Sequence, residues 1–377
     1  MSGVSVGSTP GAGRGAAAGR GAAAESSSVQ VRKLPIRLSD GRELIYFDDR
    51  EPFPSRTETD NRGLERPDTH SEIRLDVLTG EYVAMAAHRM DRTYLPPANE
   101  NPLAPTRPGE PPTEIPAPDY DVVVFENRFP AFSGGTGRCE VVCFTSDPSA
   151  SFATLSERRA RTVIEAWADR TEALSALPGT RQVVCFENRG EEIGVTLTHP
   201  HGQIYAYPYL PARTQSLLRQ AGAHRAATGG SLLADVLADE QRADVRMVLR
   251  GEQWSAYVPL AAKWPLELIL APHRDVRDLA ELTGDERAEL AVVYLDLLRR
   301  VDRFFPGVDR TPYISAWHQA PVGEDRELGR LHLQLFSVMR APGRLKFLAG
   351  SESALGAWIN DTTPERIARR LREVAES

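Results

Sequence analysis

Hydrophobic and polar positions change their period along the middle of the chain. Short β-branched and aromatic runs at 120–125, 138–144 and 182–187 predict strands. Between the last two runs, residues 156–174 repeat apolar positions at helical spacing, and Ser156 stands where a helix N-cap is expected. The apolar stripe of this predicted helix comprises Val163, Ile164, Trp167 and Leu174. The pattern therefore predicts two strands, a helix and a return to strands.

The second half of the chain repeats this order. Residues 252–260 and 265–272 predict strands, 283–305 predicts a helix, and 312–321 and 330–342 predict two more strands. The apolar face of the second helix comprises Leu290, Val293, Leu297, Val301 and Phe304.

Two residue pairs relate these halves at nearly constant spacing. Leu155 corresponds to Leu282, and His201 corresponds to Gln334. Such a repeat indicates duplication of one module. We therefore predict an α+β fold of two duplicated halves, each an antiparallel sheet with flanking helices.

Two segments differ in composition from this pattern. The first 30 residues are rich in Gly, Ala and Ser and contain no aromatic residue, which predicts a disordered tail rather than a secretion signal. Residues 96–119 are rich in proline and predict an extended, irregular loop. The predicted organisation is a tail at 1–32, a first half at 33–215, a connecting segment at 216–244, a second half at 245–365 and a C-terminal tail at 366–377.

Composition narrows the functional classes. The 377 residues carry a net charge of −7, which argues against nonspecific nucleic-acid binding because that needs basic surface. No apolar run approaches the roughly 18 residues of a membrane helix. We expect neither a nucleic-acid nor a membrane partner.

The cysteines predict free thiols. Cys139 and Cys143 lie in one predicted strand, which separates them by roughly 13 Å, beyond the roughly 7 Å limit for a disulfide. Cys185 lies in a similar run. Small buried cysteines of this kind are typical of a protein of the reducing cytoplasm.

The segment "LTHPHGQIYAYP" carries the candidate chemistry. As a strand entered from a loop, it places His199, His201, Gln203 and Tyr205 on one face. Pro200 has no N–H, so the segment is either an edge strand or the start of a strand.

That face suits attack on phosphorus. An imidazole such as His201 is a competent nucleophile near neutral pH when one ring nitrogen is free and an acceptor holds the other. The carboxamide of Gln203 can donate to a phosphoryl oxygen. Gly202 lacks a side chain, which would let a bulky anion approach the backbone. The alternative interpretation is a strand whose histidines are simply packed or bind a metal.

Several motifs together carry a family resemblance over roughly residues 70–365. "HPHGQIYAYPYLP", "FENRFPAF", "VVCFENRGEEIG", "AKWPLELILAPHR", "ISAWHQAP" and "RLKFLAGSE" occur in that order. In these motifs the chain resembles the galactose-1-phosphate uridylyltransferase family, a branch of the histidine-triad superfamily. The duplicated organisation agrees with a family that has two histidine-triad-like halves.

The resemblance implies a ping-pong exchange of UMP between UDP-glucose and galactose-1-phosphate in galactose metabolism. It makes His201 the nucleophile that carries the uridylyl group, the His199 carbonyl its support, and Gln203 a phosphate ligand. It also implies a homodimer. The substrate contacts that it implies are Arg89, Arg92, Phe125, Asn127, Asn188, Gly194, Thr196, Lys346 and Glu352.

The family's metal ligands are largely absent. Many members bind zinc through two cysteines and two histidines, but Asn101, Ala104 and Pro148 occupy three of these positions and only His199 remains. Asn, Ala and Pro side chains cannot complete a tetrahedral zinc site, so we predict no zinc there and no cofactor.

A second family metal site uses three histidines and a glutamate. Here it retains His318 and His332, with Gln334 and Leu217 at the other positions. The three remaining histidines, His199, His318 and His332, are therefore only weak metal candidates, and we expect His318 and His332 to be hydrogen-bonded, packed histidines.

Two other functions stay open. A nucleoside-diphosphate-sugar phosphorylase or adenylyltransferase of the same superfamily would share the nucleophile, although Gly202 favours the uridylyl-transferring branch, where relatives that transfer adenylyl groups commonly have serine. A non-catalytic nucleotide-sugar-binding relative would explain the missing metal ligands. A hydrolase with three histidines is disfavoured because the third position is Gln203.

Overall fold

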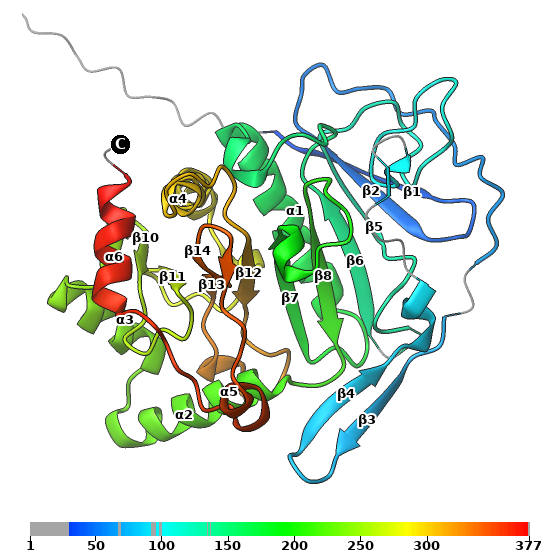
Figure 1. The fold of residues 1–377 in the computed structure, drawn as a ribbon. Helices are drawn as coiled ribbons and strands as arrows, with labels where there is room; N and C mark the ends of the chain where they lie inside the picture. Colours follow the sequence, from blue (N-terminus) through cyan, green and yellow to red (C-terminus); the bar gives the residue numbers. More distant parts are fainter. Residues whose placement is uncertain are drawn as a thin grey trace, which may run out of the picture.

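The computed structural model describes residues 30–66, 69–91, 96–97, 100–133, 135 and 137–375 (Figure 1). The predicted tail lies almost wholly outside the described residues. The strands are β1 (Arg32–Arg37), β2 (Glu43–Asp48), β3 (Glu72–Asp76), β4 (Glu81–Met85), β5 (Val122–Glu126), β6 (Arg138–Cys143), β7 (Gln182–Arg189), β8 (His201–Tyr207), β9 (Met247–Arg250), β10 (Trp254–Tyr257), β11 (Leu266–Pro272), β12 (Tyr313–His318), β13 (His332–Ser337), β14 (Met339–Ala341) and β15 (Arg344–Leu345).

The longer helices are α1 (Glu157–Ser175), α2 (Ala212–Thr228), α3 (Leu232–Ala243), α4 (Gly284–Arg303), α5 (Gly350–Leu355) and α6 (Pro364–Glu373). Short 3₁₀ turns are η1 (Ala87–Asp91), η3 (Phe152–Thr154), η4 (Glu191–Ile193), η5 (Leu279–Glu281) and η6 (Arg326–Leu328). None of the helices in the described part of the chain is long and apolar enough to span a membrane.

Within the described residues, eleven strands form one antiparallel sheet in the order β1-β2-β5-β6-β8-β7-β12-β13-β11-β10-β9. The units β5-β6-α1-β7-β8 and β10-β11-α4-β12-β13 have the same connectivity and the same strand order. The predicted α+β duplication is confirmed. The two halves join edge to edge where Tyr313 pairs with Arg189 and Trp317 pairs with Cys185, so their sheets become one.

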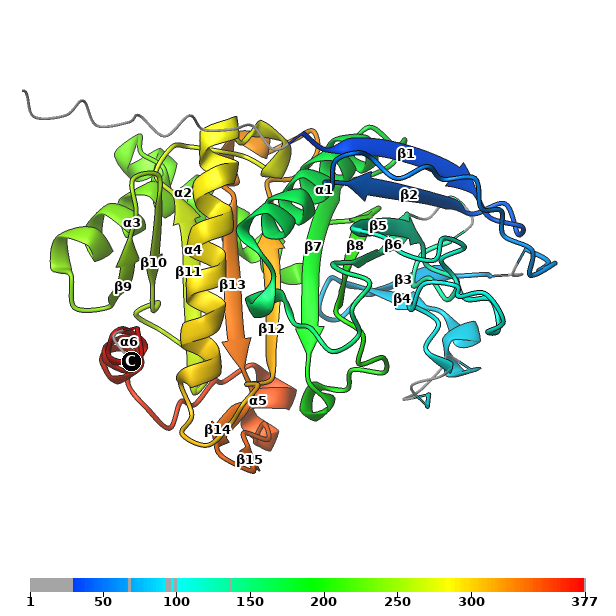
Figure 2. The same ribbon diagram turned by 90° about the horizontal axis from the view of Figure 1, so that it is seen from above.

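Helices α1 and α4 lie across one face of this sheet (Figure 2). The buried core between them and the strands includes Val163, Trp167, Leu290, Leu297 and Trp317. Ser156 caps α1 as predicted, because its hydroxyl accepts the Arg159 N–H at 3.2 Å. Burial of the two apolar stripes on one sheet face explains why the period of the sequence alternates between two and 3.6.

The other face has different covers in the two halves. In the second half, α3 packs Leu237 against Ile269, and α2 places Leu218 beside His318. In the first half, the proline-rich loop buries Leu103 and Ile115 against the strands. Among the described residues, no α-helix lies over this face of the first half, and the candidate chemistry is on this face.

The sequence prediction missed some elements. It gave no strands before residue 120, although β1 to β4 lie there, and it left 216–244 as a connecting segment although α2 and α3 occupy most of it. The predicted strand at 330–342 divides into β13 and β14. The three cysteines are buried and free, as predicted.

Candidate active site

His201 is the first residue of β8, and Pro200 precedes it directly. The strand therefore begins three residues later than the pattern from Thr198 indicated. β8 lies between β6 and β7, so the strand-start alternative is correct and the edge-strand alternative is wrong. The Pro200 carbonyl accepts the Phe144 N–H at 3.2 Å, which ties the turn to the neighbouring strand.

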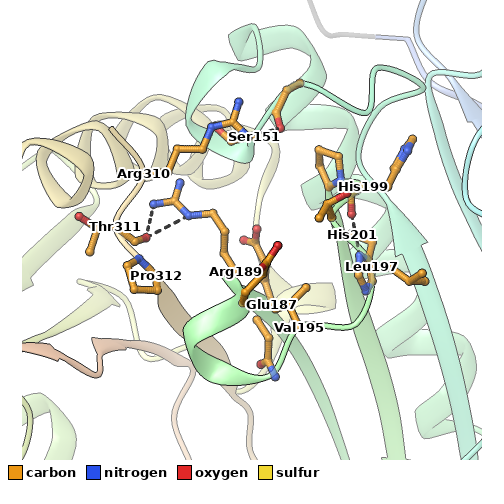
Figure 3. Close-up of a pocket in the computed structure, with 16 residues that line it drawn as sticks. Ser151, Glu187, Arg189, Val195, Leu197, His199, His201, Arg310, Thr311 and Pro312 are labelled. Atoms are coloured by element: carbon orange, nitrogen blue, oxygen red, sulfur yellow. Dashed lines mark hydrogen bonds between the residues drawn. The ribbon is translucent and has the colours of Figure 1, made fainter. Parts of the chain in front are cut away.

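The His201 ring is held at one nitrogen. Its Nδ1 lies 2.7 Å from the carbonyl oxygen of His199 (Figure 3). Because a carbonyl only accepts, Nδ1 carries the proton and Nε2 keeps its lone pair. Burial lowers the pKa of His201, and no described residue hydrogen-bonds to Nε2. The arrangement presents a neutral imidazole with a free nucleophilic nitrogen.

A cleft of about 210 Å³ opens beside this ring. Three loops and the start of β8 meet there, and Figure 3 shows His201, Arg189 and Arg310 around it. Its lining residues are Ala150, Ser151, Glu187, Asn188, Arg189, Gly190, Glu191, Val195, Leu197, Thr198, His199, Pro200, His201, Arg310, Thr311 and Pro312. The structure thus brings together His201 and the predicted contact Asn188. Gly194 ends η4 at a positive φ of 79°, and Thr196 follows in the loop that borders the cleft.

Gln203 lies two residues along the same face. The Tyr205 hydroxyl donates to Gln203 Oε1 at 3.0 Å, so the carboxamide presents its NH₂ group as donor. Arg89 reaches the same hydroxyl with Nη1 at 3.3 Å. The structure therefore groups Arg89 with Gln203, whereas Arg92 lies outside the described residues.

The structure explains the need for glycine at position 202 differently from the sequence. A Cβ atom there would lie 2.8 Å from the Phe186 carbonyl oxygen and 2.9 Å from the Phe144 ring. The Phe144 ring lies on the helix-covered side of the sheet, and the Phe186 carbonyl belongs to the neighbouring strand. The missing side chain accommodates this packing, and the expectation that it opens space for an anion is wrong.

The His199 ring is buried behind the nucleophile, with 1% of the residue exposed. Asn101 Nδ2 lies 3.0 Å from its Nδ1, and the Thr145 carbonyl oxygen lies 2.8 Å from its Nε2. Burial lowers the pKa of His199 to about 4. These groups do not fit a zinc site, because an amide N–H occupies the nitrogen that a metal would need, and Ala104 and Pro148 offer no ligand atom.

The second weak metal position also lacks a ligand set. The rings of His318 and His332 stack at 4.8 Å between centroids and 10° between planes. The Gln334 amide donates to Glu267 Oε1 at 2.6 Å. Burial lowers the pKa of His332 to about 4, which favours a neutral, packed imidazole. Two imidazoles and an engaged amide do not complete a four-ligand site.

The other predicted contacts lie away from the cleft. Phe125 is buried in the first half, and Asn127 borders a separate hollow that is also lined by Arg66 and Arg128. Lys346 and Glu352 form an ion pair at 3.0 Å in the second half. Neither Lys346 nor Glu352 lines the cleft at His201.

Lys346 and Glu352 have their charges satisfied within the chain. The Lys346 ammonium also donates to the carbonyl oxygens of Lys263, at 2.8 Å, and Ile359. Glu352 accepts the N–H groups of Ala349 and Ile359, each at 3.0 Å. These bonds lower the pKa of Glu352 to about 2. The pair is therefore a preformed unit rather than two free charges.

Sequence reasoning missed several residues of the cleft. Arg310 donates to the Ser149 and Ala150 carbonyl oxygens and lines its rim. Arg189 pairs with Asp302 from α4. Arg189 directly follows Asn188 in "CFENRG", and this adjacency was the one sequence signal for it. Arg310 lies in a loop without a periodic pattern, so the sequence gave no signal for it.

A duplicated α+β sheet with a supported, neutral imidazole beside a cleft defines a class of site suited to nucleophilic chemistry by histidine. Comparison with known proteins narrows the class. The family description "galactose-1-phosphate uridyl transferase, N-terminal domain" matches residues 133–211, and the corresponding C-terminal domain matches residues 217–377.

Relatives agree with this match. A galactose-1-phosphate uridylyltransferase of Streptomyces lividans is 50% identical over 92% of this chain and 99% of its own length. One from Thermotoga maritima is 32% identical over 80% of this chain and 98% of its own length. A solved uridylyltransferase structure is 29% identical, with a TM-score of 0.71 over 81% of this chain and 99% of that one. The chain belongs to the galactose-1-phosphate uridylyltransferase family.

Proposed function

We propose that this chain exchanges UMP between UDP-glucose and galactose-1-phosphate, as a nucleotidyltransferase of galactose metabolism. The observation that carries the proposal is the His201 ring, whose Nδ1 donates to the His199 carbonyl at 2.7 Å while Nε2 is free beside the cleft. The names of the relatives support the same reaction.

The proposed reaction has two displacements. Nε2 of His201 forms a bond to the α-phosphorus of UDP-glucose, and the bond from that phosphorus to the bridging oxygen breaks. Glucose-1-phosphate leaves with the bond's electron pair. The uridylyl group then rests on a cationic imidazole that still carries its Nδ1 proton. The phosphate oxygen of galactose-1-phosphate attacks the same phosphorus, Nε2 leaves, and UDP-galactose forms.

Three groups assist these steps. The His199 carbonyl stabilises the positive charge that the ring gains, because it already accepts the Nδ1 proton. The NH₂ group of Gln203 donates to a phosphoryl oxygen, since Tyr205 has taken its carbonyl side. Asn188, Gly194 and Thr196 are proposed as contacts of the diphosphate, from the strand and loop that border the cleft.

We further propose a cytoplasmic homodimer. The pair Lys346 and Glu352 lies outside the cleft of its own chain, and the family resemblance assigns it to the hexose-phosphate end. A second copy could bring the pair to the cleft. The proposal also includes three further substrate contacts, Phe125, Asn127 and Arg89. It divides the chain into two halves, at 33–215 and 245–365.

A labelling experiment tests the reaction. The protein is incubated with UDP-glucose labelled in the uridine and quenched, and protein-bound label is measured. We expect acid-labile, base-stable label that galactose-1-phosphate discharges as UDP-galactose. His201→Ala should remove the label. His224→Ala, at a histidine that pairs with Asp235 on α3, should retain it.

The same experiment separates the alternatives. Discharge by inorganic phosphate or pyrophosphate, and not by galactose-1-phosphate, would indicate a nucleoside-diphosphate-sugar phosphorylase. An unlabelled wild-type protein that still binds UDP-glucose would indicate a non-catalytic relative. Label that persists in His201→Ala would refute the assignment of the nucleophile.

A further inference from the structure

The buried ring behind the nucleophile is surrounded by polar groups from three segments. Asn101 comes from the proline-rich loop, Tyr120 from the end of that loop, and Thr145 from the segment after β6. All three hydrogen-bond to the ring of His199. Both ring nitrogens are engaged in these bonds, so the ring of His199 is not itself available to a substrate.

The partner groups determine which nitrogen of the His199 ring donates and which accepts. The Leu103 N–H donates to Asn101 Oδ1 at 3.0 Å, which turns the amide nitrogen of Asn101 toward Nδ1 of His199 at 3.0 Å. An amide nitrogen only donates, so Nδ1 is the unprotonated nitrogen. The Thr145 carbonyl only accepts, so Nε2 carries the proton.

Tyr120 fits the same directions. Its hydroxyl donates to the Leu103 carbonyl at 2.8 Å, and its oxygen lies 2.7 Å from Nε2 of His199. The Nε2 proton is therefore shared between the Tyr120 oxygen and the Thr145 carbonyl. Every donor at this ring has an acceptor, which matches a neutral histidine. The low pKa of His199 agrees with it.

We propose that Asn101 and Tyr120 are positioning residues for His201. They hold His199 as a neutral imidazole with its proton on Nε2, and thereby fix the carbonyl of His199 that accepts the Nδ1 proton of the nucleophile. This inference rests on the function proposed above. It assigns to hydrogen bonds the anchoring of the loop and strand start that a metal ion would otherwise supply.

The backbone geometry explains how holding the His199 ring also fixes the direction of the His199 carbonyl. Pro200 restricts the backbone of His199 to extended conformations, so its carbonyl direction follows closely from where the residue itself is held. The ring is held on both nitrogens, and the loop that carries Asn101 is itself held by the buried Leu103. A loose His199 would let its carbonyl move relative to His201 Nδ1.

The same bonds compete with a metal. A neutral imidazole has one lone pair for coordination, and the Asn101 amide occupies it. A cation would have to displace Asn101 and would find no ligand at Ala104 or Pro148. Asn101 is thus a functional replacement rather than a vacant ligand position.

Three variants test the proposal by kinetics. Asn101→Asp replaces the donor with an acceptor of the same shape, and Asn101→Leu removes it. Thr113→Val is the matched control, because it deletes the bonds of the Thr113 hydroxyl within the same loop, to Thr106, Ala104 and Ile115, without touching His199. Labelling of the protein by UDP-glucose and steady-state kinetics are measured for all three.

We expect both Asn101 variants to lower kcat and the rate of labelling by about 10- to 100-fold. KM for UDP-glucose should stay within about twofold, because no substrate contact is lost. Thr113→Val should keep kcat within about threefold. Equal losses in Thr113→Val and Asn101→Leu would show that Asn101 merely stabilises the loop, and would overturn the proposal.

Nitrogen NMR of histidine-labelled protein gives a readout independent of activity. We expect one ring in the wild type with a bare Nδ1 and a protonated Nε2 from pH 6 to 8, and protonation of Nδ1 of that ring in Asn101→Asp. If no histidine ring differs in protonation between the wild type and Asn101→Asp, the proposed hydrogen bonding of His199 is refuted. If the wild type takes no label from UDP-glucose, the proposed function fails, while the NMR result still decides how His199 is held.

Discussion

Gly202 offers a sharp test of the packing beside His201. A methyl group at this position would lie 2.8 Å from the Phe186 carbonyl oxygen and 2.9 Å from the Phe144 ring. The oxygen belongs to β7, which pairs with β8 through Phe186 and Gln203, so it cannot withdraw without opening that ladder. Gly202→Ala therefore perturbs both the core and the strand that carries His201.

The expected loss follows from overpacking. Insertion of a methylene-sized group into a filled core costs about 1–3 kcal/mol. For a chain of 377 residues the entropy of unfolding is about 0.8 kcal/mol/K. Gly202→Ala should then lower Tm by about 1–4 °C. Phe144 is fully buried and packs edge-on against Phe152 and Trp167, so it cannot turn aside.

The assay is thermal and urea unfolding of the wild type, Gly202→Ala and a matched glycine variant. Gly222 lies inside α2, where an added Cβ would meet Leu328 at an ordinary 3.6 Å. Gly222→Ala should stabilise the protein by about 0.5–1 kcal/mol through helix propensity. Labelling by UDP-glucose is measured alongside and should slow in Gly202→Ala only.

A double mutant isolates the ring contact. Phe144→Leu removes the ring atoms that the added methyl would meet, so the stability loss of Gly202→Ala/Phe144→Leu should be about 1 kcal/mol smaller than the sum of the two single losses. Unchanged stability of Gly202→Ala would refute the reasoning. So would strict additivity with Phe144→Leu, which would show that the ring is not the obstacle.

Three further outcomes are expected. Burial raises the pKa of Glu187 to about 7, so the native state binds this proton more tightly than the unfolded chain does. The contribution of Glu187 to the free energy of unfolding therefore falls as pH rises from about 4.5 to 7. Glu187→Gln should abolish this pH-dependent loss, which amounts to up to about 3 kcal/mol, as measured by urea unfolding at each pH. Lys346→Met removes the cation beside Glu352 and should lower Tm, whereas Arg74→Met at an exposed pair should change Tm little. Dialysis against a chelator should leave Tm and labelling unchanged; stoichiometric metal that survives dialysis would contradict this.

The sequence predicted the parts of the fold whose periodicity is set by burial. Helices α1 and α4 bury one stripe on a sheet, so their apolar spacing identified them. By contrast, α2 has a weak stripe, with few buried residues such as Leu218 and Ala221, and its pattern resembles a polar connection. Among the described strands, β3 and β4 pair with each other alone and leave Leu75 and Tyr82 exposed, so burial imposes no alternation there.

The candidate site divides in the same way. His201 and Gln203 lie in one strand, so strand geometry was enough to place them on one face, whereas His199 precedes the strand. Asn101 contacts His199 from 98 residues away, and only the tertiary fold brings them together. The sequence registered Asn101 as a missing zinc ligand and gave no sign that its amide would take the ligand's place.

The duplicated strands show what separates a catalytic half from a supporting one. β8 and β13 occupy equivalent places in the sheet, and both point polar side chains to the face opposite α1 and α4. On β13, His332 and Gln334 are 8% and 2% exposed, because α2 covers them and leaves a cavity of only about 20 Å³. On β8 no helix intervenes, and the cleft at His201 is about 210 Å³. An imidazole on the open strand can reach a phosphate, while one on the covered strand can only pack. Two differences therefore separate the halves: Gln334 stands where the first half has His201, and α2 closes the space that the first half leaves open.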